Sequence, residues 1–172
     1  MFKHLLIPLD GSHLAEAALP LAQELAHRFG STITLLRVPD NPLFPLAGGN
    51  EASARYWHEL RQTAYDEATS YLEKQQTMLA DMLPSATINI QVVSNMPPAD
   101  AILYFAETAK ADTIVMNTHG RGGFRRWVYG SVANKVLSHS SVPILLVRAN
   151  EEFDLELPTI RDLADMRSHE PA

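Results

Sequence analysis

The sequence of 172 residues contains no cysteine, which excludes disulfide bonds and thiolate metal sites. It also lacks any apolar run close to the roughly 20 residues that a membrane-spanning helix needs. Near the start, the apolar stretch from Leu5 to Leu9 is too short for the apolar core of a signal peptide. These absences predict a protein that is neither exported nor embedded in a membrane, and they favour the cytoplasm.

Motifs for catalysis and metal binding are also missing. The sequence has no G-x-x-x-x-G-K-[ST] phosphate loop, no G-x-S-x-G nucleophile elbow and no H-E-x-x-H zinc motif. Its seven histidines are scattered without the spacing of metal ligands. The sequence therefore predicts no catalytic set and no metal site.

Acidic residues outnumber basic ones: the chain has 20 Asp and Glu against 14 Lys and Arg, which gives a formal net charge of −6. Residues 113–150 are the exception, with five basic and no acidic residues, so the remainder of the chain carries −11. A small polyanion such as a nucleotide suits this positive island, whereas a long nucleic acid needs a broad basic face. We therefore expect a nucleotide as the partner and no nucleic acid.

The composition is 46% hydrophobic and 20% charged, which is typical of a soluble globular domain with a full core. Residues 150–172 are acidic and polar and include two prolines, so they are too few and too polar to form a domain. We expect one domain over residues 1–149 and an acidic C-terminal tail over residues 150–172.

Strand and helix patterns alternate along the chain. One helix is expected from Leu14 to Phe29, where Gly30 ends it, and a long amphipathic helix from about residue 51 to Leu83. Another helix begins at Pro97-Pro98. This alternation predicts an α/β fold with a single doubly wound, Rossmann-like, parallel five-stranded sheet. The expected strands are Lys3–Leu9, Thr32–Val38, Thr87–Val93, a strand that starts at Thr113, and Pro143–Arg148.

The segment from Ala111 to Leu137 concentrates the glycines of the chain. It passes from a buried strand pattern through a loop to a helix pattern, and Ser131 stands where an N-cap hydroxyl belongs. Glycines allow a ligand to approach the backbone, and the free N–H groups at a helix start attract anions. The segment therefore predicts a phosphate-binding loop, with glycines at Gly120, Gly122, Gly123 and Gly130.

This segment resembles the nucleotide-binding loop of the universal stress protein family, in which glycine, two residues, glycine, nine residues and glycine precede serine or threonine. Here Gly120, Gly130 and Ser131 keep that spacing, while Asn117 stands at the first glycine. Asparagine tolerates left-handed backbone better than other non-glycine residues, so the turn can survive. The resemblance covers about residues 1–149, including Asp10-Gly11-Ser12 and the closing strand from Val142 to Val147.

The resemblance implies strand order 3-2-1-4-5 and a site for ATP, AMP or ADP, with or without Mg²⁺, between strands one and four. Ligands of such sheets bind beyond the carboxyl ends of the strands at this switch point, where Asp10 and Asn117 would face each other. By resemblance Asp10 lies at the nucleoside and Val38 lines the adenine. The full set of expected binding residues is Pro8, Leu9, Asp10, Val38, Met116, Asn117, His119, Gly120, Arg121, Gly122, Gly130, Ser131, Val132 and Ala133.

The residues alone leave simpler alternatives open. Asp10 could only cap the following helix, Val38 could be an ordinary buried strand residue, and Ser131 could be a plain N-cap. Arg121, Arg125 and Arg126 could form a solvated face. His119 could shape the loop or donate to a phosphate.

Three functions are compatible with these patterns. The first is a stress-response regulatory protein that binds an adenine nucleotide and acts by occupancy. The second is a slow Mg²⁺-dependent ATP hydrolase, and the third is a nucleotide-free dimeric adaptor. The apolar edge strand Pro143–Val147 predicts a homodimer formed by pairing of two such strands, which the resemblance also implies.

Overall fold

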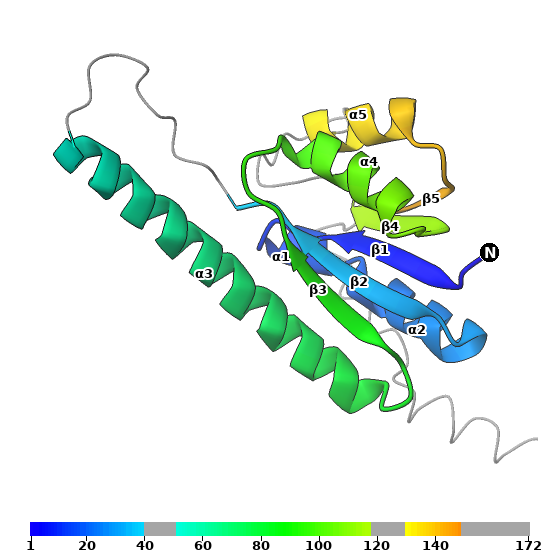
Figure 1. Ribbon diagram of the computed structural model, residues 1–172. Helices are drawn as coiled ribbons and strands as arrows, with labels where there is room; N and C mark the ends of the chain where they lie inside the picture. The colour runs from blue at the N-terminus through cyan, green and yellow to red at the C-terminus, as the bar shows by residue number, and fades with distance from the viewer. Residues whose placement is uncertain (40–50, 118–129, 149–172) are drawn as a thin grey trace, which may run out of the picture.

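A parallel sheet of five strands forms the centre of the molecule (Figure 1). The structure is a computed structural model, and it describes residues 1–39, 51–117 and 130–148. The strand order is β3-β2-β1-β4-β5, so the predicted fold class and strand order are confirmed. The strands are β1 His4–Pro8, β2 Thr32–Arg37, β3 Ile88–Val92, β4 Thr113–Asn117 and β5 Ile144–Val147.

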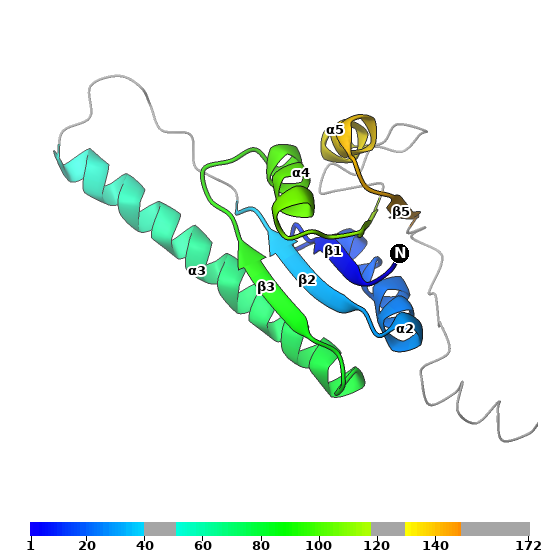
Figure 2. The same cartoon turned by 45° about the vertical axis from the view of Figure 1, so that its right-hand side comes forward.

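Helices cover both faces of the sheet, as Figures 1 and 2 show from two directions. One face packs against α1, α2 and α3, and the other packs against α4 and α5. The helices are α1 His13–Glu16, α2 Leu19–Phe29, α3 Glu51–Met82, α4 Pro98–Thr108 and α5 Ser131–His139.

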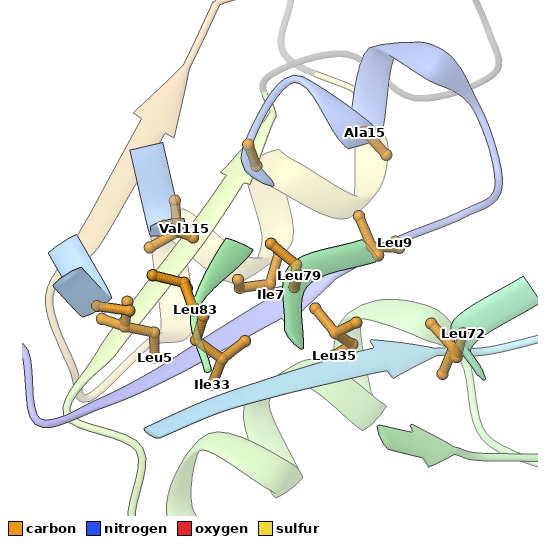
Figure 3. Packing of buried hydrophobic residues seen from close by; sticks show 13 residues of the cluster. Leu5, Ile7, Leu9, Ala15, Ile33, Leu35, Leu72, Leu79, Leu83 and Val115 are labelled. Carbon is orange, nitrogen blue, oxygen red and sulfur yellow. The ribbon is translucent and has the colours of Figure 1, made fainter. Parts of the chain in front are cut away.

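The central strand β1 shows why its sequence is almost continuously apolar. Successive side chains of a strand point to opposite faces, and a parallel sheet buries both faces. Leu5 and Ile7 belong to the core shown in Figure 3, whereas Leu6 belongs to the core on the other face, and all three are fully buried. The strand that leads to Asp10 is therefore packed on both faces.

The helix expected from Leu14 to Phe29 is in fact two helices, so that prediction is wrong in its continuity. Helix α1 ends at Glu16 and helix α2 begins at Leu19, with Pro20 in the first turn of α2. Proline has no N–H to donate within a helix, but it is well tolerated at a helix start. Gly30 ends α2 as expected, with the left-handed φ of 62° that glycine adopts without steric cost.

The remaining elements match their predictions to within one or two residues. Helix α3 has 32 residues and is about 48 Å long at 1.5 Å per residue. Ala68, Leu72 and Leu79 bury its middle and C-terminal part against the sheet. No helix in the described ranges is long and apolar enough to cross a membrane.

Candidate functional site

The candidate site lies at the carboxyl ends of β1 and β4, where the strand order reverses. Pro8 ends β1, and the following Leu9 donates its N–H to the Leu36 carbonyl at 2.8 Å. On β4, Met116 and Asn117 are its last two residues, and both are buried. The structure thus brings Pro8, Leu9, Met116 and Asn117 to one edge of the sheet.

Asp10 organises the turn between β1 and α1. Its Oδ1 accepts from the Ser12 N–H at 2.9 Å and from the Ser12 hydroxyl at 2.6 Å. The Ser12 Oγ in turn accepts from the Ala15 N–H at 3.2 Å, so Ser12 is the N-cap of α1. Gly11 between them has a φ of 85°, a conformation that glycine adopts readily. Asp10 therefore supports the cap and does not itself cap the helix.

Asn117 differs from its expected role as a turn residue. It is the last residue of β4, pairs in register with Val147, and is 6% exposed. Its side-chain Nδ2 donates to the main-chain carbonyl of Leu14 in α1. The prediction of a left-handed turn at this position is wrong, because the strand continues through Asn117 and the side chain ties α1 to β4.

The expected N-cap at Ser131 is also displaced by one residue. Gly130 is the N-cap, with φ −55° and ψ 154°, and its carbonyl accepts from the Asn134 N–H at 2.9 Å. Ser131 is the exposed first residue of α5. An N-cap has extended backbone and accepts the first helical hydrogen bond, and Gly130 meets both conditions.

The N-terminus of α5 suits an anion. Gly130 offers no side-chain cap to the first turn, and no other described side chain bonds to it. The first N–H groups of a helix have no partner within the helix, and they carry the positive end of its dipole. Val132 is half-buried and Ala133 is buried, so these residues would meet a ligand through their backbone.

Val38 is half-buried and lies one residue beyond β2. The preceding Arg37 accepts through its carbonyl from the Val93 N–H at 3.0 Å, which fixes the backbone at this point. The expected residues His119, Gly120, Arg121 and Gly122 lie outside the described residues, as do Gly123, Arg125 and Arg126.

Sequence reasoning missed a polar cluster beside the Asp10 turn. The Tyr71 hydroxyl donates to Glu16 Oε1 at 2.8 Å, and Gln75 Nε2 donates to the same oxygen at 3.1 Å. The Arg37 guanidinium lies over the Tyr71 ring, with its Cζ 4.5 Å from the ring centroid. These residues come from α1, β2 and α3, so no local sequence pattern could have joined them. Within the described ranges, no group of three or more histidine or acidic side chains could hold a metal ion.

Comparison with known proteins identifies the family of this chain and solved structures of the same fold. The model of the universal stress protein family matches residues 1–148. Universal stress protein MJ0531 of Methanocaldococcus jannaschii is 30% identical over 148 residues, which cover 86% of this chain and 83% of that protein. The solved structure of hypothetical protein MJ0577 is 26% identical, with a TM-score of 0.73, over 87% of this chain and 98% of that one.

Two further solved structures that share the fold carry nucleotides. A universal stress protein in complex with cAMP is 20% identical, with a TM-score of 0.61, over 86% of this chain and 98% of that one. A protein of the same family from Arabidopsis thaliana, with AMP bound, is 14% identical, with a TM-score of 0.57, over 87% of this chain and 93% of that one.

Proposed function

Because the chain belongs to the universal stress protein family, we propose that it is a stress-response regulatory protein that binds an adenine nucleotide at the β1/β4 switch point. It acts by occupancy: the bound and free forms differ, and no chemical turnover is needed. ATP, AMP and ADP are the candidate ligands, with Mg²⁺ accompanying a triphosphate.

The observation that carries this proposal is the position of Asp10. The carboxylate stands just beyond β1 at the reversal of strand order, and Ser12 fixes it through Oδ1. A carboxylate is a strong acceptor for the hydroxyl groups of a ribose. Ligands of doubly wound sheets bind at this place, which supports a nucleoside beside Asp10.

The N-terminus of α5 supplies the second half of the proposed site. The backbone N–H groups of Ser131, Val132 and Ala133 suit a phosphate, and the exposed Ser131 hydroxyl can add a further donor. The cAMP and AMP found in proteins of the same fold support this choice of ligand. The residues present therefore fit an adenine nucleotide.

Mass spectrometry of an acid extract of the purified full-length chain tests the proposal. We expect an adenine nucleotide to be released from the wild type, and less from Asp10→Asn, which keeps an acceptor for Ser12 but loses the charge. Release of phosphate from added ATP and Mg²⁺ would instead identify a hydrolase. Absence of both bound nucleotide and turnover would favour a nucleotide-free adaptor.

We also propose a homodimer through β5, and the two sheet edges support this choice. At the β3 edge, Thr87 O accepts from Ile33 N in β2, so the next carbonyl, that of Ile88, points outward by alternation. Gln76 of α3 donates to this carbonyl at 2.6 Å. Capping of an edge strand by a side chain opposes pairing with another chain.

The β5 edge has a different character. Pro143 directs its carbonyl to β4, because that carbonyl accepts from Ile114 N. Backbone groups alternate along a strand, so Leu145 also directs its groups to β4, whereas Ile144 and Leu146 direct theirs outward. No described side chain caps these outward groups as Gln76 caps Ile88. A second copy related by a two-fold axis would pair with them.

We further propose that residues 1–149 form the domain, that residues 150–172 form an acidic tail, and that the protein works in the cytoplasm.

A further inference from the structure

We propose that Arg37 is a positioning residue for the nucleoside-binding turn, and that Tyr71 and Glu16 hold it in place. Tyr71 and Glu16 keep the guanidinium in contact with the Asp10-Gly11-Ser12 turn, and this contact fixes the direction of the Asp10 carboxylate. The effect on ligand affinity rests on the proposed function, whereas the effect on the turn does not.

The contact between Arg37 and Gly11 is the first step. A Cβ added at Gly11 would lie 2.9 Å from one terminal guanidinium nitrogen of Arg37, 3.1 Å from its Cζ and 3.2 Å from the other terminal nitrogen. Side chains do not approach a Cβ this closely, so the guanidinium occupies the space that glycine leaves empty. The glycine thus serves two needs, since its φ of 85° also disfavours other residues.

The second step is what holds the guanidinium there. The Tyr71 ring lies under Arg37 at 4.5 Å, a distance at which an arginine is attracted to the face of an aromatic ring. The ring itself is anchored at its far end, because its hydroxyl donates to Glu16. Burial raises the pKa of Tyr71 first, and the hydrogen bond to Glu16 raises it further, so the hydroxyl keeps its proton and remains a donor.

The third step is the link to the rigid part of the fold. Gln75 is 6% exposed, lies one helical turn after Tyr71, and donates to the same Glu16 oxygen. Leu72, next to Tyr71, is fully buried in the core. Helix α3 is therefore anchored in the core. Its Tyr71 contacts Arg37, and Arg37 in turn contacts the Asp10-Gly11-Ser12 turn.

Charge adds to the packing. The Arg37 guanidinium and the Asp10 carboxylate act on the Tyr71 hydroxyl with opposite sign, so both lie within electrostatic range of it. A cation fixed on one side of the turn attracts the carboxylate and restricts its motion. Removal of the guanidinium should therefore loosen both the backbone of the turn and the Asp10 side chain.

Amide hydrogen exchange, followed by NMR on the full-length chain, tests the effect on the turn. Arg37→Met keeps the aliphatic length and removes the charge and the stacking group. We expect exchange of the Ser12 amide, which donates to Asp10 Oδ1, to rise about tenfold, because the turn opens locally more often. Arg28→Met is the matched control, since Arg28 pairs with Glu24 on the surface of α2. Unchanged exchange at Ser12 in Arg37→Met would overturn the proposal.

Calorimetric titration with adenosine tests the effect on binding. We expect Arg37→Met to weaken adenosine binding about fivefold to tenfold, because Asp10 is then held less firmly in the direction that the ligand needs. In an Asp10→Asn background, the same substitution should cost little further affinity, because Arg37 acts through Asp10. An equal loss in both backgrounds would overturn the positioning role. Failure of the wild type to bind adenosine would refute the proposed function alone, and hydrogen exchange would still decide the role of Arg37.

A last variant separates the contact between Arg37 and the Tyr71 ring from the hydrogen bond between Tyr71 and Glu16. Tyr71→Phe keeps the ring under Arg37 and removes the hydroxyl that bonds to Glu16. We expect a smaller rise in exchange at Ser12 than in Arg37→Met. Tyr65→Phe is the control, because Tyr65 is an exposed tyrosine of the same helix. A rise in Tyr65→Phe equal to that in Tyr71→Phe would contradict the proposed chain of contacts.

Discussion

The Asn117 side-chain amide donates a hydrogen bond to the main-chain carbonyl of Leu14, which lies 103 residues earlier in the chain. This contact joins the end of β4 to the helix that follows the Asp10 turn. Where the family pattern places a glycine, this chain thus has a side chain that ties β4 to α1.

Asn117→Gly should destabilise the fold, although it restores the glycine of the family pattern. The substitution removes the donor to Leu14 and places glycine in a strand, which together should cost about 1–3 kcal/mol. Denaturant unfolding of the variant measures this loss. Asn89→Gly is the control, because Asn89 is an exposed residue of the edge strand β3. Equal stabilities of Asn117→Gly and wild type would show that the hydrogen bond to Leu14 contributes nothing.

Substitutions at Gly130 should move stability and affinity in opposite directions. Its extended backbone suits an N-cap side chain, and an aspartate there should stabilise α5 by about 0.5 kcal/mol. The same carboxylate would repel a phosphate at the helix start, so Gly130→Asp should raise the melting temperature and weaken ATP binding. Gly130→Ser provides the uncharged control. Undiminished ATP affinity in Gly130→Asp would remove the N-terminus of α5 from the site.

The dimer should depend on the outward backbone groups of β5. Leu146→Pro removes an outward N–H and should convert the dimer to a monomer, measured by light scattering. Leu145→Pro removes an N–H that points to β4, so it should destabilise the fold itself. A wild type that is monomeric at micromolar concentration would refute pairing through β5.

Asp112 should give the stability a dependence on pH. Burial alone would raise the pKa of its carboxyl, but hydrogen bonds from the Lys3 N–H, the Thr113 hydroxyl and the His4 backbone outweigh it and lower the pKa. A lowered pKa in the folded state means that the stabilisation is complete above the ordinary pKa of about 3.9 and is lost as the pH falls through the folded value.

Asp112→Asn should therefore be less stable than the wild type at pH 7, and the difference should shrink below about pH 4. Denaturant unfolding at pH 7 and pH 3 measures this change. Asp81→Asn is the control, since Asp81 is exposed on α3. A difference for Asp112→Asn that stays constant between the two pH values would contradict the assignment.

The sequence was sufficient for the fold because its signals are local. The apolar runs of β1 and β4 and the breaker Gly30 depend on neighbouring residues, so strands, helices and the sheet class could be predicted. The break between α1 and α2 was missed, because the apolar spacing runs through Pro20 without interruption.

The details of the site could not be predicted, since they depend on contacts between distant segments. The partner of Asn117 lies in α1, and the support of Arg37 lies in α3. The N-cap at Gly130 follows from the extended backbone of that residue, which the spacing of glycine and serine does not determine. Spacing in the sequence locates such residues near one another, but it does not give the direction of a side chain.

Calorimetric titration of AMP into the full-length chain tests the central claim most directly, with Asp10→Asn and Asp81→Asn measured alongside. We predict that the wild type and Asp81→Asn bind AMP with the same affinity. Asp10→Asn should bind about tenfold more weakly, which corresponds to about 1.4 kcal/mol. A wild type that binds no AMP at millimolar concentration, or an Asp10→Asn variant that binds it as tightly as the wild type, would contradict a nucleotide site at the β1/β4 switch point.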